Sequence, residues 1–260
     1  MVSMSGETVA ALLEAYTDAT MDGIYEQDLA YIQARGFGDV ARGAAPEILR
    51  VLRAGSRPVH RVVDAGCGAG SISAALVDAG FDVTGIDVSE ELLSIARSAC
   101  PSGKFLHGSI YDRPIPPCEA ILAVGEPLTY HETDGAEERV PSFFQRASAA
   151  LPFGGMLIFD IIELGEPSLE GRFWKTGDDW AVLAETQEDQ SARVLVRNIE
   201  TFRKIGDSYR RGREVHRVRL FDSGEVCRWL DAAGFDVTTA QSYGEFRLPP
   251  RRRAFFSVRR

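Results

Sequence analysis

Arg61-Val62-Val63-Asp64-Ala65-Gly66-Cys67-Gly68-Ala69-Gly70 decides the fold of this chain, because an apolar strand here runs directly into a glycine turn that opens a helix. Glycines let the backbone approach a ligand closely and adopt conformations barred to other residues. Asp87 ends the next predicted strand, and a carboxylate at this position typically accepts hydrogen bonds from ribose hydroxyls. The stretch therefore predicts a ligand site at the edge of an α/β sheet.

The order of the glycines narrows the kind of ligand. A dinucleotide-binding turn needs GxGxxG, which seats a pyrophosphate on the helix N-terminus, whereas this chain has GxGxG at Gly66, Gly68 and Gly70. The preceding Asp64 would repel a pyrophosphate, but it suits a ligand that carries an ammonium and a sulfonium group. Glycine turns alone are weak evidence, since a tight turn between a strand and a helix can contain a glycine in any α/β protein.

Strand-like and helix-like runs alternate on both sides of this turn. Helical spacing extends from Glu7 to about Ala54, before the first strand. The alternation predicts an α/β fold with a doubly wound, mostly parallel, seven-stranded sheet. The predicted elements are Arg61–Asp64, Ser71–Ala79, Phe81–Ile86, Glu90–Ala99, Lys104–His107, Ala120–Val124, Glu138–Leu151, Met156–Ile162, Ser223–Ala233, Asp236–Ser242 and Ala254–Val258.

The alternation breaks after Asp160. An irregular stretch, Leu164 to Asp179, leads into three β-like runs, which predict an antiparallel cap over the carboxyl edge of the sheet. These runs are Trp180–Glu185, Arg193–Arg203 and Tyr209–Leu220. The predicted organisation is an N-terminal helical lid over residues 1–58, a core over 59–163, the cap over 164–221 and completion of the core sheet over 222–260.

Two motifs resemble those of class I methyltransferases that depend on S-adenosylmethionine (SAM). They are Val63-Asp64-Ala65-Gly66-Cys67-Gly68-Ala69-Gly70 and Thr84-Gly85-Ile86-Asp87-Val88-Ser89. Leu151-Pro152-Phe153-Gly154-Gly155 also resembles the "LxxGG" segment before the fifth strand of this family. The resemblance implies SAM as cofactor and S-adenosylhomocysteine as product.

The family implies a role for each matching position. The Gly66–Gly70 turn would hold the methionine moiety, Asp87 the ribose hydroxyls and Val88 the adenine, which Ser109 and Ile110 would also face. The family often has an acid where Ser109 stands. The full predicted cofactor-binding set is Asp64, Ala65, Gly66, Gly68, Gly70, Asp87, Val88, Ser109, Ile110, Val124, Gly125, Tyr16 and Tyr25.

The remainder is similar to small-molecule methyltransferases with an antiparallel sheet inserted after strand five, such as sugar N-methyltransferases, and to bacterial methyltransferases without a settled substrate. The loop after the fourth strand lies where this fold places the reacting centre. Glu126 would anchor or deprotonate an acceptor, Tyr130 would orient it, and His131 would act as a base. The alternatives are that Glu126 caps its loop and that His131 is solvated.

His216 and the tyrosines of the leading helices complete the candidate set. His216 alternates with apolar residues in a strand, so it points either into the cap's cavity or out to water. Tyr16, Tyr25 and Tyr31 either close over the cofactor as a lid or pack in the core. The predicted acceptor is a small molecule, methylated on nitrogen or oxygen.

Composition excludes several other partners. The formal charge of −9 disfavours a phosphate backbone as partner, and Arg251-Arg252-Arg253 is predicted to form a solvated face beside the last strand. No stretch approaches the roughly 18 apolar residues that span a bilayer, and the N-terminus lacks a signal region, so we expect a cytoplasmic protein. The four cysteines have no metal-ligand spacing.

Two alternatives to an active methyltransferase remain open on the sequence. One is a SAM-binding regulatory module without transfer activity, and the other is a nicotinamide-dependent oxidoreductase, which the glycine order and Asp64 disfavour. The sequence predicts neither the acceptor nor the oligomeric state.

Overall fold

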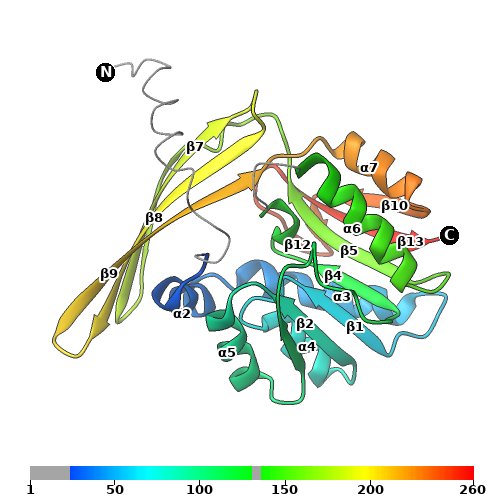
Figure 1. Ribbon diagram of the computed structural model, residues 1–260, viewed down its shortest axis with the longest axis horizontal. Helices are drawn as coiled ribbons and strands as arrows, with labels where there is room; N and C mark the ends of the chain where they lie inside the picture. The colour runs from blue at the N-terminus through cyan, green and yellow to red at the C-terminus, as the bar shows by residue number, and fades with distance from the viewer. Residues whose placement is uncertain (1–23, 131–135) are drawn as a thin grey trace.

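The computed structural model describes residues 24–130 and 136–260, so the first part of the predicted helical region, from Glu7 to residue 23, lies outside the described residues. A seven-stranded sheet forms the centre of the molecule (Figure 1). Across the sheet the order is β10 (Phe235–Ala240), β13 (Arg252–Arg259), β5 (Met156–Ile162), β4 (Ala120–Ala123), β1 (Arg61–Ala65), β2 (Asp82–Asp87) and β3 (Lys104–His107). The pairs from β5 to β3 are parallel, and β13 is antiparallel to both of its neighbours. The predicted doubly wound, mostly parallel sheet is confirmed.

Helices cover both faces of this sheet, which is why its central strands are continuous apolar runs. α3 (Asp39–Ala54) and α4 (Ser71–Asp78) pack on one face, and α6 (Ala136–Ala150) and α7 (Ser223–Ala232) pack on the other. Adjacent residues of β1 serve opposite faces: Val62 contacts the α3 side and Val63 the α6 side. α5 (Glu90–Ala99) packs beside the edge strand β3.

The inserted cap is a second, antiparallel sheet, seen as the long twisted ribbon in Figure 1. It contains β6 (Gly171–Thr176), β7 (Trp180–Asp189), β8 (Val194–Ile205) and β9 (Ser208–Arg219), joined in sequence order. The prediction of an antiparallel insertion is correct, but it missed β6. That strand is almost entirely exposed, so its sequence carries no alternation of buried and exposed residues; pairing with β7 holds it in place.

α2 (Gln27–Gly36) packs against the cap. Leu29 and Ile32 pack against Trp180, Val182 and Ile199 on the inner face of the cap sheet. Hydrophobic contacts of this kind fix the helix over the carboxyl edge of the main sheet, where the ends of β1, β2 and β4 meet.

An ion pair reinforces the same contact. The Asp28 carboxylate of α2 accepts two hydrogen bonds from the Arg210 guanidinium of β9, both 2.5 Å long. These contacts hold the pKa of Asp28 below its usual value, even though burial acts in the opposite direction. α2 is therefore attached to the cap by both apolar and charged contacts.

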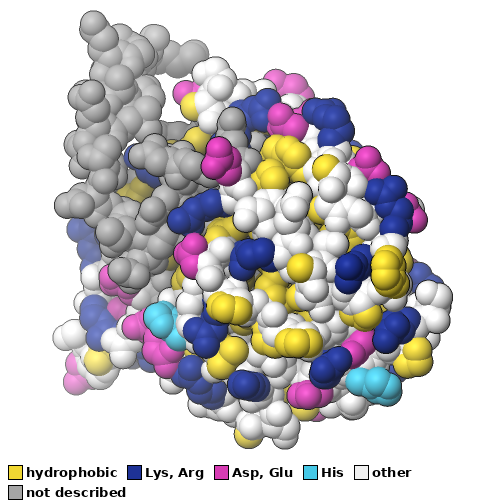
Figure 2. All heavy atoms as spheres, turned by 45° about the vertical axis from the view of Figure 1, so that its right-hand side comes forward, with side chains coloured by type: hydrophobic (Ala, Val, Ile, Leu, Met, Phe, Trp, Pro, Cys, Tyr) yellow, Lys and Arg dark blue, Asp and Glu magenta, His cyan; other side chains and the backbone are white. Residues whose placement is uncertain are grey.

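The surface of the main domain mixes charges of both signs. On the face shown in Figure 2, Lys and Arg side chains are interspersed with Asp, Glu and scattered apolar groups. None of the helices in the described ranges is long and apolar enough to cross a membrane.

Candidate active site

The glycine turn brings backbone to the carboxyl edge of the sheet. Gly66, Gly68 and Gly70 have φ angles of 77°, 53° and 79°, in the left-handed region that glycine tolerates best. A Cβ atom added to Gly66 would lie 2.2 Å from Cβ of Pro127, so no side chain fits there. Gly68 faces open space instead, which leaves its backbone accessible to a ligand.

Two buried carboxylates flank this turn. Asp87 accepts hydrogen bonds from the backbone N–H of Gly68 at 2.8 Å and of Ser89 at 3.0 Å, while burial raises its pKa above the usual value. Asp64 accepts a hydrogen bond from Ser73 Oγ at 2.6 Å. Burial, with a smaller contribution from the Asp87 charge, raises the pKa of Asp64 to about 6.

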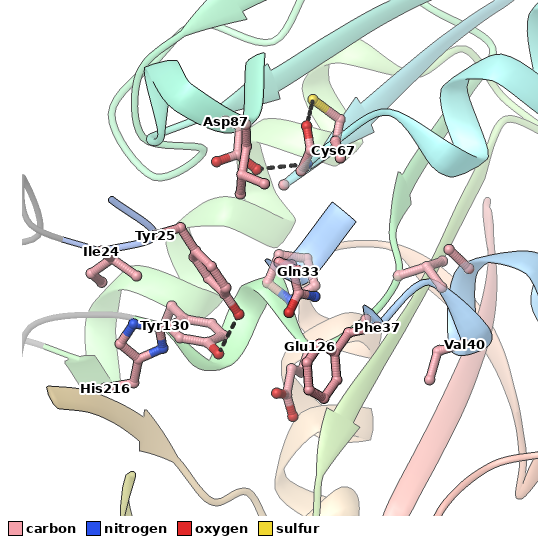
Figure 3. A pocket seen from close by; sticks show the side chains of 18 of the residues that line it. Ile24, Tyr25, Gln33, Phe37, Val40, Cys67, Asp87, Glu126, Tyr130 and His216 are labelled. Carbon is pink, nitrogen blue, oxygen red and sulfur yellow. Dashed lines mark hydrogen bonds between the residues drawn. The ribbon is translucent and has the colours of Figure 1, made fainter. Parts of the chain in front are cut away.

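A cavity of about 500 Å³ opens between this edge and the cap, within the size range of small-molecule sites. Figure 3 shows Asp87 on one side of it and Tyr25, Tyr130 and His216 on the other. Most of the predicted cofactor set lines the cavity: Asp64, Gly66, Gly68, Asp87, Val88, Ser109, Ile110, Val124, Gly125 and Tyr25.

Two described members of that predicted set, Ala65 and Gly70, do not line the cavity. Ala65 packs in the core on the α6 face of the sheet. Gly70 lies behind the turn, where an added Cβ would approach Ala96 Cβ to 3.0 Å, so it serves helix packing. Tyr16 lies outside the described residues.

The cavity wall fits SAM by its chemistry. Asp64 and Asp87 supply carboxylates for an ammonium group and for ribose hydroxyls, and the open space at Gly68 and Gly125 admits a ligand against bare backbone. Val88, Leu92 and Ile110 supply apolar surface for a flat ring. The individual roles in cofactor binding stay predictions.

Glu126 stands at the centre of a buried charge cluster. Its Oε1 accepts from Arg197 Nη1 of β8 at 2.6 Å, and its Oε2 lies 2.6 Å from Arg252 Nη2 of β13. Burial by itself would raise the pKa of Glu126, but the two arginines outweigh burial and hold it below its usual value. A carboxylate held in this way is suited to anchoring and is a poor proton acceptor.

Asp160 of β5 fixes the loop that carries Glu126. Its carboxylate accepts from the backbone N–H of Gly125 at 2.8 Å and of Glu126 at 3.0 Å, and from the Tyr243 hydroxyl at 3.2 Å. Glu126 has a φ of 68°, which is costly for a residue with a side chain. The bonds to Asp160 and the ion pairs compensate for that cost.

The acceptor end of the cavity contains two tyrosines and a histidine. The hydroxyls of Tyr25 and Tyr130 lie 3.0 Å apart, and Arg197 Nη1 donates to the Tyr130 hydroxyl at 3.2 Å. The His216 ring meets Tyr25 edge-on at a centroid distance of 4.8 Å and Tyr130 at 5.7 Å (Figure 3). The side chain of His216 thus points into the cavity, whereas His131 lies outside the described residues.

Sequence reasoning missed the arginines of this site. The expectation that Arg251-Arg252-Arg253 forms a solvated face is wrong: Arg251 is buried against Glu188, Arg252 binds Glu126 and Asp160, and Arg253 binds Glu163. Arg197 lies directly opposite His216 in the pairing of β8 with β9, and this register became visible only in the structure.

Comparison with known proteins agrees with this geometry. Residues 62–155 match the sequence profile of a methyltransferase domain family, over the region that contains the glycine turn, Asp87 and Glu126. The chain carries a SAM-dependent methyltransferase domain.

Relatives extend the likeness beyond this domain. A putative methyltransferase of Bacillus subtilis, YqeM, is 27% identical over 188 residues, which cover 68% of this chain and 74% of YqeM. The methyltransferase fold also matches two crystal structures. A SAM-dependent methyltransferase of Clostridium acetobutylicum has a TM-score of 0.74 at 20% identity, covering 88% of this chain and 96% of the other. The sugar N-methyltransferase KedS8 of a Streptoalloteichus species has a TM-score of 0.75 at 19% identity, covering 100% and 99%.

Proposed function

We propose that this SAM-dependent methyltransferase transfers a methyl group to a nitrogen or oxygen atom of a small-molecule acceptor bound beneath the cap. One observation carries the proposal. A single cavity of about 500 Å³ runs from the carboxylates Asp64 and Asp87 to Tyr130, His216 and Arg197, which the loop after β4 and the cap contribute. The cofactor and a small acceptor would thus share one enclosed space.

The cofactor end would hold the ligand by charge and by apolar contact. Asp87 would accept from ribose hydroxyls, Asp64 would pair with the ammonium group, and Val88 and Ile110 would flank the adenine. When bound, SAM supplies a methyl group on a positively charged sulfur atom, whose bonding electrons leave with the sulfur. The protein therefore has to align the acceptor and remove one proton, and alignment alone supplies much of the rate.

The acceptor end would recognise a molecule with both polar and apolar parts. Phe37, Val182 and Ile199 supply apolar surface to the cavity wall, and Tyr130 and Arg197 supply hydrogen-bonding groups. The fold of the sugar N-methyltransferase KedS8, which matches the whole chain, supports an acceptor of this kind.

We also propose that the chain is divided into an N-terminal lid over 1–58, a core over 59–163, a cap over 164–221 and a closing segment over 222–260.

Incubation with methyl-labelled SAM and a metabolite extract tests the proposal. We expect label in a small-molecule product, identified by mass, and S-adenosylhomocysteine in equal amount. Label that enters only protein or nucleic acid would overturn the choice of acceptor. Binding of SAM without transfer to any fraction would favour the regulatory alternative.

A further inference from the structure

The Glu214 carboxylate of β9 joins three parts of the molecule. Its Oε2 accepts from the backbone N–H of Tyr25 at 2.7 Å and lies 2.8 Å from His216 Nε2, and its Oε1 accepts from the backbone N–H of Glu26 at 3.0 Å. Its side chain is only 8% exposed. One buried carboxylate thus binds the segment before α2 and the histidine that lines the acceptor end of the cavity.

This contact fixes the tautomer of His216. An ionised carboxylate can only accept hydrogen bonds, so Nε2 must carry the proton that it shares with Glu214. In a neutral imidazole the lone pair then resides on Nδ1. Within the described ranges no group forms a hydrogen bond to Nδ1, and the ring lines the cavity. Nδ1 is therefore available to an acceptor molecule.

The neighbouring groups are poorer proton acceptors. The two arginines keep Glu126 ionised and engaged. Burial raises the pKa of Tyr130, and burial and the contact with Tyr130 raise the pKa of Tyr25 well above its usual value, so both hydroxyls keep their protons. At this end of the cavity, the imidazole of His216 offers a ring nitrogen, Nδ1, to which no described group forms a hydrogen bond and whose lone pair can accept a proton.

Building on the proposed methyl transfer, we propose that Glu214 is a positioning residue that holds His216 as the proton acceptor of the reaction. The proton leaves the acceptor's nitrogen or oxygen atom for Nδ1, and its bonding electron pair stays on that atom, which keeps it nucleophilic. Nε2 retains its own proton, and the ionised Glu214 stabilises the positive charge that develops on the imidazole.

The same carboxylate makes the base depend on the segment before α2. The carbonyl of Tyr25 accepts from Ser89 Oγ at 2.9 Å, and the backbone N–H of Ser89 binds Asp87 in the cofactor end. Tyr25 is thus held between the cofactor end and Glu214. The backbone N–H groups of residues 25 and 26 complete the set of donors to the Glu214 carboxylate, so this segment helps to fix the carboxylate that holds His216.

The test uses the full-length chain, and its first readout is nitrogen NMR of the imidazoles. The chain has four histidines, and the His216 signals are those lost in His216→Gln. In the parent protein we expect a protonated Nε2 and an unprotonated Nδ1. Glu214→Gln should produce a mixture of tautomers, because a side-chain amide cannot accept from three N–H donors as the carboxylate does. A parent protein with its proton on Nδ1 would overturn the proposal, whether or not the variant folds.

Hydrogen exchange and turnover supply independent readouts. Exchange of the Tyr25 and Glu26 amides should accelerate roughly tenfold or more in Glu214→Gln, since each loses a bond to a charged acceptor. Glu185→Gln is the matched control, because Glu185 pairs with the exposed Arg172 on β6. With the acceptor found in the labelled extract, kcat should fall about a hundredfold in Glu214→Gln and stay at the parent value in the control.

The outcomes separate this proposal from the proposed function. Unchanged tautomer, exchange and kcat in Glu214→Gln would refute the role of Glu214 while methyl transfer by the parent stands. A parent protein that does not bind SAM in a calorimetric titration would refute the proposed function, and the NMR and exchange results would then show only a structural contact.

Discussion

Replacing Arg197 with methionine tests the charge cluster that joins the cap to the core. The change keeps most of the side-chain volume and removes the guanidinium that donates to both Glu126 and Tyr130. Breaking one partner of a buried ion pair typically costs about 3–5 kcal/mol. Because Arg252 still pairs with Glu126 at 2.6 Å, we expect the lower end, about 3 kcal/mol.

Denaturant unfolding and thermal melts of the parent and Arg197→Met measure this loss. For a chain of this size, about 3 kcal/mol corresponds to a decrease in Tm of roughly 6–12 °C. Arg211→Met is the matched control, because Arg211 forms an exposed pair with Glu200 on the outer face of the cap. Such a pair contributes about 1 kcal/mol or less. Equal stability of Arg197→Met and the parent would refute our interpretation of the cluster.

The pH dependence of the unfolding free energy separates lost charge from lost packing in Arg197→Met. In the parent the arginines hold the pKa of Glu126 below its usual value, so its contribution to stability is present at neutral pH and is lost as pH falls through that low pKa. In Arg197→Met, of the two arginines only Arg252 remains to counteract the effect of burial, so the pKa of Glu126 rises and Glu126 takes up its proton at higher pH. The difference in unfolding free energy between the two proteins should therefore shrink as pH falls from 7 toward 4.5. A difference that is constant with pH would show that lost packing, rather than lost charge, is the cause.

Three further predictions concern the cofactor end. Asp87→Ala should weaken SAM binding by about 1.5–3 kcal/mol in a folded protein, because a charged hydrogen-bond acceptor is lost; unchanged affinity by calorimetry would remove Asp87 from the site. SAM affinity of the parent should fall below about pH 6, where Asp64 takes up a proton, and an affinity that is flat from pH 7.5 to 5 would contradict its pairing with the ammonium group. Gly66→Ala should lower the unfolding free energy by about 2–4 kcal/mol, since its Cβ would collide with Pro127 and strain a left-handed backbone; a Tm equal to the parent's would contradict this.

The central sheet could be predicted because its signals are local. The glycine turn after β1 and the continuous apolar runs of β4 and β5 are visible within a few residues, and the predicted bounds differ from the observed ones by at most one residue. The cap strands carry weaker signals. β7 was predicted to end at Glu185 but continues to Asp189, because its polar second half is held by pairing with β8 rather than by burial.

The two ends of the cavity differ in the same way. The cofactor end is built from contiguous motifs, so a reader of the sequence finds Asp64, the glycines and Asp87 together. The acceptor end is built from residues far apart in the chain: Glu126 and Arg197 are separated by 71 positions, and Tyr25 and Glu214 by 189. No local pattern pairs such residues, and only the folded chain brings them together.

Long-range pairs of this kind make the cap strands part of the cavity wall. Were the cap a cover placed over a finished core, its contacts with the core would be apolar and replaceable. Besides apolar contacts, its strands supply the charges that satisfy buried carboxylates elsewhere: Arg197 binds Glu126 of the core loop, and Arg210 binds Asp28 of α2. Removing either arginine leaves a buried carboxylate with fewer partners, which is far costlier than losing an exposed one. A substitution of either arginine in the cap therefore alters the environment of a buried carboxylate outside the cap, and the acceptor end is built from both the cap and the core loop.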